Sequence, residues 1–218
     1  MQSLAERRTV FFEFLLFLFS GLLCLAIPSL IIFRQPFLFL TFFYILFSMR
    51  RWVRSSLIPV EALGFSRARE GWGVFWFSLV GILLAFFFVA ILFPQTIQLE
   101  QIRRENALMP VMSVPMIVAY YVFVSVPLQE IVFRVFLLNR LQMCFSFFVK
   151  GKLADTLSII ASAVFFGIAH VPFGHFVFSF STFILGLLWG WMMIRYKNIY
   201  PILAMHAILG SVLIRFIL

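Results

Sequence analysis

The stretch that decides the fold is VPLQEIVFRVFLL, residues 126–138, in which an amide, a carboxylate and a guanidinium interrupt a run of large apolar side chains. A charged side chain at the bilayer centre costs roughly 2.5–3.5 kcal/mol on insertion scales, so such groups pair, line a wet cavity or do chemistry. On a helix Glu130 and Arg134 share one face, and Gln129 lies about 100° round the axis from Glu130. Two interpretations follow: a buried ion pair that fixes helix packing, and an active site within the membrane.

The composition of the whole chain is that of an integral membrane protein. Of its 218 residues, 64% are hydrophobic and 11% are charged, against about 45–50% and 25% in a soluble domain. The net charge of +9 comes from bases at the ends of apolar segments. This placement favours topology control and contact with anionic lipid over binding to nucleic acid. We therefore predict an all-α, polytopic helical bundle in the lipid bilayer, with no nucleic-acid partner.

Apolar runs predict seven or eight transmembrane helices in a single membrane domain, residues 1–218. N-terminal helices and a basic cytoplasmic stretch occupy residues 1–70, and a core that carries the polar groups occupies about 111–215. The run 111–148 is about twice the ~20 residues that span a bilayer, so it is either one helix broken near Pro127 or two segments that meet there. Other helices of this core and the span before it are expected at residues 72–93, 157–170, 176–194 and 201–216.

Clusters of basic residues set the expected orientation in the membrane. They occur near the N-terminus, over residues 50–69, at 150–152 and at 195–197, and all lie on one side if residues 111–148 cross once. Because an excess of Lys and Arg marks cytoplasmic loops, we expect the N-terminus in the cytoplasm.

Two of the three histidines lie in apolar segments of the core. His170 follows Phe166 by four residues at the end of a span, His206 lies in the first half of the last helix, and His175 lies in a loop. In a soluble protein a buried imidazole is more often simply satisfied by a carbonyl. Here two imidazoles, a carboxylate and a guanidinium make up most of the ionisable groups of the membrane interior, which favours one shared site.

Such a group of side chains has three chemical uses. A carboxylate and an imidazole can activate water while a second imidazole donates to an oxyanion. The same groups could ligate zinc, but no His-Glu-x-x-His pair is present, so we expect no cofactor. Buried Glu and His also relay protons in transporters, although no paired half-repeats are visible. Counted from the nearest basic turns, His206 lies shallower than Glu130, so one site requires a kink at Pro127 or a cavity reaching in from one face.

Three polar motifs follow one another along the chain: QExxxR at residues 129–134, FxxxH at 166–170, and His206 in an apolar final helix. They resemble the Glu-Glu-x-x-x-Arg, Phe-x-x-x-His and His-x-x-x-Asn motifs of the CPBP family, the CAAX proteases and bacteriocin-processing (Abi-type) intramembrane endopeptidases. The resemblance covers residues 60–215. It implies a glutamic-type membrane endopeptidase that cuts a membrane-associated protein or peptide, whether a C-terminal sorting signal, a leader peptide or a CAAX-like tail. Because one chain shows no prenyl machinery, a peptide or sorting signal in a prokaryotic inner (plasma) membrane is favoured.

The resemblance also implies a role for each matching position. Gln129 stands at the general base, Glu130 is the second acid with Arg134 as its partner, His170 orients or activates water, and His206 serves the oxyanion. The expected catalytic residues are Gln129, Glu130, His170 and His206, with Arg134, Phe166 and Gly210 in support.

Two of these positions depart from the family pattern. Gln129 replaces the first Glu, and an amide can hold a water but cannot take its proton at neutral pH. Gly210 replaces the Asn four residues after His206, and loss of one oxyanion donor can cost ~2.7–4 kcal/mol. Three explanations of Gln129 are open: an engineered change that inactivates the enzyme or traps substrate, a natural variant in which Glu130 is the base, and a non-catalytic member. The alternatives to a protease are thus a membrane binding or immunity protein and, less favoured, a proton-coupled transporter.

Overall fold

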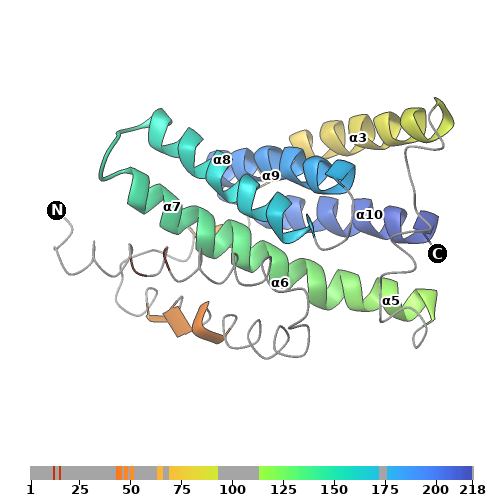
Figure 1. The fold of residues 1–218 in the computed structure, drawn as a ribbon, viewed down its shortest axis with the longest axis horizontal. Helices are drawn as coiled ribbons and strands as arrows, with labels where there is room; N and C mark the ends of the chain where they lie inside the picture. Colours follow the sequence, from red (N-terminus) through yellow and green to blue (C-terminus); the bar gives the residue numbers. More distant parts are fainter. Residues whose placement is uncertain are drawn as a thin grey trace.

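The computed structural model describes residues 12, 15, 43–45, 47, 48, 50, 51, 63–65, 69–92, 113–171 and 176–217. Within these residues the regular elements are helices, and the only β pairing is an isolated antiparallel bridge between Phe65 and Asn198 (Figure 1). The predicted all-helical architecture is confirmed for this part of the chain. Most of the expected helices before residue 63, most of the basic stretch, the loop after residue 92 and His175 lie outside it.

The elements follow one another along the described core as α-helices and π-helices. They are α3 (Trp72–Leu92), α5 (Val114–Tyr120), η4 (Tyr121–Ser125), α6 (Val126–Glu130), η5 (Ile131–Leu137), α7 (Leu138–Phe145), α8 (Lys152–Ala169), α9 (Phe176–Tyr196) and α10 (Tyr200–Ile217).

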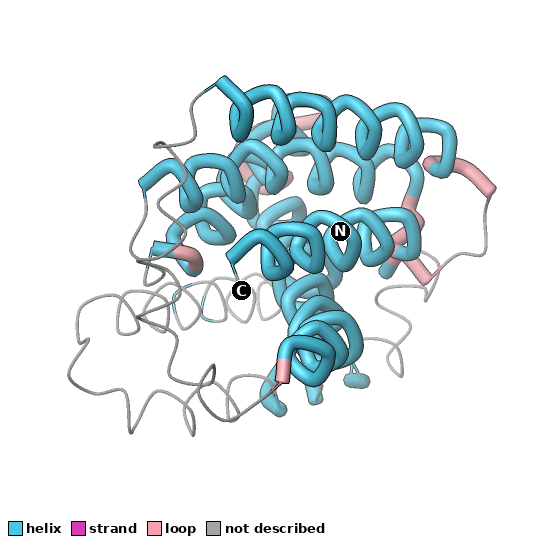
Figure 2. Tube along the Cα trace, turned by 90° about the vertical axis from the view of Figure 1, so that its right-hand side faces the viewer, coloured by secondary structure: helices cyan, strands magenta, loops and turns pink. Residues whose placement is uncertain are grey.

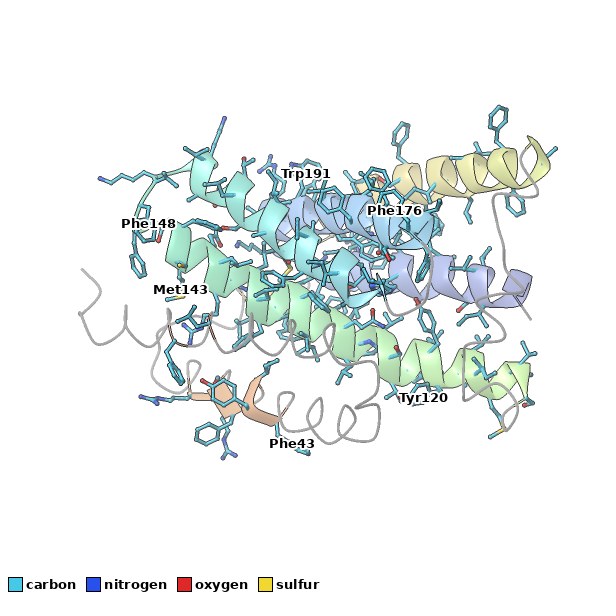
Figure 3. All side chains as sticks on the ribbon, in the orientation of Figure 1. Phe43, Tyr120, Met143, Phe148, Phe176 and Trp191 are labelled. Atoms are coloured by element: carbon cyan, nitrogen blue, oxygen red, sulfur yellow. The ribbon has the colours of Figure 1, made fainter. Side chains whose placement is uncertain are left out.

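Three helices of the described part are long and apolar enough to cross a membrane: Val114–Phe145, Lys152–Ala169 and Phe176–Tyr196. Shorter apolar stretches at Trp72–Ala85 and Tyr200–Ile214 add to them. Large apolar side chains are exposed on the outside of the bundle, among them Phe176 and Phe148, which Figure 3 labels near the turn after α7, and they would face lipid. These features agree with a membrane helical bundle, whereas seven or eight spans remain a prediction.

The elements from α5 to α7 form one uninterrupted helix of 32 residues, Val114–Phe145. The backbone does not break at Pro127, so the expectation of a broken helix is wrong. Proline has no N–H to donate, and the turn before it is π-helical: the Val126 N–H bonds to the Tyr121 carbonyl, five residues back. A second π segment, η5, follows Glu130. The long helix therefore accommodates Pro127 through wider, π-helical segments before and after the turn that carries Gln129 and Glu130.

The remaining helices pack around this long helix. After a short turn α8 runs back along α7, α9 packs against α8, and α10 contacts α3, α6 and α9. Figure 1 shows α10 between α3 and the long helix, and the view in Figure 2 shows that the helices form a bundle rather than one flat layer. The largest buried side chains include Trp189, Arg134 and Phe166, so the centre of the bundle is partly polar.

The start of α10 is fixed by the segment at residues 63–70. The Ile199 N–H donates to the Gly64 carbonyl at 2.8 Å, and the Asn198 amide donates to the Glu70 carbonyl at 3.2 Å. Gly64 has φ of +86°, a left-handed conformation that favours glycine. This contact anchors the end of α10 that carries His206.

Helices α8 and α9 approach closely at two glycines, as their spacing of four residues predicts. A Cβ on Gly186 would lie 3.0 Å from the Cα and Cβ of Ala163, and one on Gly190 would lie 3.2 Å from Ile159 Cγ2. Both distances are too short for a side chain to be added without moving a neighbour. The packing of α8, which ends at His170, therefore depends on these glycines.

We expect Gly186→Ala to destabilise the protein by about 1–3 kcal/mol, because the new methyl group overpacks the contact with Ala163. Gly81→Ala is the matched control: Gly81 is also helical, and a Cβ there meets nothing within 4 Å. Thermal unfolding of both variants in the same detergent measures the difference. Equal stability of the two variants would contradict the close approach.

Candidate active site

The long helix places the carboxylate and the guanidinium of the first motif on one buried face. Glu130 ends α6 and Arg134 lies one turn later in η5, and neither side chain is exposed. Arg134 Nε lies 3.3 Å from Glu130 Oε2, the i,i+4 ion pair that the sequence predicts. A buried pair of charges is costly to desolvate, so further partners must stabilise it.

His206 of α10 provides the second partner of Glu130. Its Nδ1 lies 2.7 Å from Glu130 Oε1, and both side chains are buried. An ionised carboxylate only accepts hydrogen bonds, so Nδ1 carries the hydrogen and Nε2 is the ring nitrogen that remains for other chemistry. Two residues that are 76 apart in sequence are thus joined directly. The concern that His206 lies too shallow for a shared site is removed without a break at Pro127.

His170 lies at the C-terminal end of α8, directly after the last helical residue. Its Nδ1 donates to the Phe166 carbonyl at 2.7 Å, which fixes the ring by its own helix. A carbonyl cannot donate, so Nε2 carries the lone pair of the neutral ring. The local contact therefore orients the imidazole with its basic nitrogen directed away from the backbone.

Phe166 joins the three motifs. Its ring centroid lies 4.6 Å from that of His170 and 5.8 Å from that of His206. The Arg134 guanidinium lies over the same ring, 4.4 Å from its centroid. An aromatic face attracts a cation, by more where water is excluded. The two imidazoles and the ion pair therefore lie around one phenylalanine, which the sequence placed only in support.

Trp189 of α9 also lies against the site, in contact with both His206 and Phe166. The Trp189 and His206 ring centroids are 4.7 Å apart with planes tilted by 32°, and the indole N–H points to Met205 Sδ at 3.2 Å. Trp189 is also 5.5 Å from the Arg134 guanidinium. No motif marks this residue, so the sequence analysis missed it.

Gln129 is turned towards its own helix. Its Nε2 donates to Ser125 Oγ at 2.9 Å, and within the described part of the chain its buried Oε1 has no hydrogen-bond partner. Ion pairs and the shared Phe166 ring therefore join Glu130, Arg134, His170 and His206, while Gln129 lies next to Glu130 along the chain and keeps an acceptor available. A buried carbonyl oxygen without a donor is a natural place for a water.

Gly210, the second departure from the family pattern, lies one turn after His206 and faces Tyr121 of η4. A Cβ on Gly210 would overlap the Tyr121 hydroxyl and the adjacent ring carbons. The Tyr121 ring also meets the His206 imidazole edge-on, with centroids 5.9 Å apart. Tyr121 is a second residue of this region that the sequence analysis did not single out, and no signal in a single sequence pairs it with Gly210.

Among the described residues, no group of three His, Cys, Asp or Glu side chains lies together as metal ligands would. Glu130 pairs directly with His206 and Arg134, whereas His170 lies against the Phe166 ring, which also contacts His206. His175 lies outside the described residues.

A comparison with family models matches residues 110–212 to a family described as type II CAAX prenyl endopeptidase Rce1-like. No curated protein and no solved structure matches the chain. The matched region runs from just before the long helix to just after Gly210 and contains every residue of the site. It includes the three helices of the described part that are long enough to span, in keeping with an integral membrane protein. Residues 110–212 of this chain are therefore similar to the Rce1-like family of CAAX-type endopeptidases, the protease family that the three motifs resemble.

Proposed function

We propose that the protein is an intramembrane endopeptidase that hydrolyses a peptide bond near the membrane-associated end of a protein or peptide. The observation that carries the proposal is the contact between Glu130 and His206, with His170 beside the same Phe166 ring. Ionisable groups from three helices gather in the bundle centre, where isolated charges are expensive. A packing role needs only the ion pair, whereas hydrolysis also uses two oriented imidazoles.

The proposed reaction begins with a water held by the Gln129 carbonyl oxygen. Its oxygen adds to the carbonyl carbon of the substrate, and its proton passes to His170 Nε2. The carbonyl oxygen becomes an oxyanion. When it collapses, the C–N bond breaks and His170 returns the proton to the leaving amine. The products are a carboxylic acid and an amine.

His206 is proposed to stabilise the oxyanion. Its Nδ1 donates to Glu130 Oε1, so Nε2 is the ring nitrogen that faces the oxyanion and donates to it when it carries a hydrogen. Glu130 then acts by holding and orienting His206, and Arg134 holds Glu130 in place. Gln129 orients the water without taking its proton, so the enzyme with Gln129 works below the rate that a carboxylate at this position would allow.

The test is cleavage in proteoliposomes of three labelled probes: a farnesylated CAAX peptide, a leader-type peptide and a peptide ending in a membrane-inserted sorting helix. We expect cleavage of at least one probe, found by mass spectrometry as two fragments. His170→Gln should lower the rate by about 10²-fold, since an amide cannot accept the proton. Thermal unfolding shows that the variant is folded. Absence of cleavage of all three by both the wild type and Gln129→Glu would refute the proposal.

A second candidate function is favoured by Gln129 itself, because a protein that binds a segment without cutting it needs no base. It would use the same group of residues to hold a membrane-inserted peptide. In that case His206→Ala weakens association with the probe peptides, and Gln129→Glu leaves all three intact.

A further inference from the structure

We propose that the Tyr121 hydroxyl is a second hydrogen-bond donor to the oxyanion, in the place of a side chain that position 210 lacks. The inference rests on the proposed function and names a further catalytic residue for it. Its starting point is a fit between two helices: the phenol from η4 occupies the space beside Gly210 that any Cβ would fill.

The fit is specific to the end of the tyrosine ring. The three atoms that a Cβ on Gly210 would meet first are the hydroxyl oxygen and the two ring carbons next to it. Gly210 lies one turn beyond His206 on α10, so a side chain there would project on the face that carries His206. The hydroxyl of Tyr121 therefore lies where a donor at position 210 would begin.

The Tyr121 hydroxyl makes only a weak hydrogen bond in this structure. It donates to the His206 carbonyl at 3.4 Å, long against the ~2.7–2.8 Å that O–H donors prefer. A long bond is weak, so the hydrogen can turn to a developing negative charge at little cost. A pre-placed donor of this kind acts mainly on the transition state, which is where donation accelerates a reaction.

The direction of Tyr121 is set by the π segment before Pro127. Tyr121 is the first residue of η4, and its carbonyl accepts the five-residue bond from Val126. A π turn is wider than an α turn and so rotates the residues before it relative to those after it. The neighbouring Tyr120 points away from the helices and is 49% exposed (Figure 3). Adjacent residues of a helix point about 100° apart, so Tyr121 can face His206 while Tyr120 lies on the surface, and the widened turn sets how Tyr121 is placed relative to Glu130 further along the helix.

The test compares Tyr121→Phe with Tyr120→Phe, using whichever of the three probe peptides the wild type cleaves. Each variant loses one hydroxyl and keeps its ring, so both should fold with wild-type thermal stability. We expect Tyr121→Phe to lower kcat by about 10²–10³-fold with KM unchanged, the loss typical of one oxyanion donor. Tyr120→Phe should leave kcat and KM unchanged.

A rescue variant separates donation from packing. Tyr121→Ala empties the space beside Gly210, and the double variant Tyr121→Ala/Gly210→Asn fills it with an amide donor. We expect the double variant to cleave faster than Tyr121→Ala, and Tyr121→Ala/Gly210→Leu, which fills the space without a donor, to stay as slow. Equal rates for the asparagine and leucine variants would overturn the inference.

Failure of this inference differs from failure of the proposed function. If the wild type cleaves a probe and Tyr121→Phe cleaves it at the same kcat, the donor role of Tyr121 is wrong and the protease stands. If neither the wild type nor Gln129→Glu cleaves any probe, the proposed function fails and the role of Tyr121 with it.

Discussion

Gln129→Glu is expected to raise the rate of peptide cleavage by about 10²–10⁴-fold, the usual contribution of a positioned general base. In the present chain Gln129 carries a buried carbonyl oxygen with no partner among the described residues. That oxygen can accept a hydrogen bond from water, but the amide cannot take the proton. Glutamate has nearly the same shape and adds this ability. The new carboxylate would share with His170 a task that His170 is proposed to carry alone.

A control must show that the higher cleavage rate of Gln129→Glu comes from proton transfer to the new carboxylate. Gln129→Met is the control, because it keeps the length of the side chain and removes its polar atoms. Its rate should not exceed that of the wild type. The activity gained by Gln129→Glu should also rise with pH as the new carboxyl group ionises. Rates are measured in proteoliposomes with the probe that the wild type cleaves.

The size of this gain also separates the three explanations of Gln129. A large gain fits an enzyme slowed or trapped by the loss of its first acid. If the wild type already cleaves well and Gln129→Glu is no faster, the chain is a natural variant with another base. No cleavage by either form, together with binding that depends on His206, fits a non-catalytic member.

The sequence predicted that Glu130, Arg134 and the two imidazoles lie together, but not the contacts that join them. Motif spacing was enough to place Glu130 and Arg134 on one helix face, because i,i+4 neighbours meet on any α-helix. The bond from His206 to Glu130 crosses between two helices, and no local rule gives the depth at which two spans meet. For the same reason the depth counted from basic turns was misleading. Turns locate the ends of a helix, but packing decides which residues of tilted helices face each other.

The way in which the long helix accommodates Pro127 shows a second limit of prediction from the sequence. A proline inside a helix predicts a kink or break because it lacks an N–H and crowds the preceding turn. The long helix instead absorbs it with a π segment and stays continuous. Tyr121 and Trp189 escaped prediction because an aromatic residue in a membrane helix is ordinarily core or lipid contact. Their positions in the site become apparent only from the structure. Tyr121 lies against Gly210 and His206, and Trp189 lies against His206.

Removing one partner of the Glu130–Arg134 pair is expected to destabilise the protein by about 3–5 kcal/mol, because the other charge is left buried without compensation. Both side chains are fully buried, and none of the three guanidinium nitrogens of Arg134 makes a hydrogen bond in the described part of the chain, so the ion pair from Nε to Glu130 is the main compensation of its charge. Glu130→Leu and Arg134→Met are the single variants. Thermal unfolding in detergent, followed by helical circular dichroism, measures the loss.

The double variant Glu130→Leu/Arg134→Met separates stability from function. Replacing both members of a buried pair with apolar side chains is often neutral or stabilising by about 1–4 kcal/mol, so the double variant should regain most of the stability lost by either single variant. Its cleavage activity should remain lost, because His206 no longer has a carboxylate at Nδ1 to orient it. A double variant that is stable and active would show that the pair serves packing alone. One that is as unstable as the single variants would show that the pair contributes more to folding than its desolvation costs, so its retention would not require a role in catalysis.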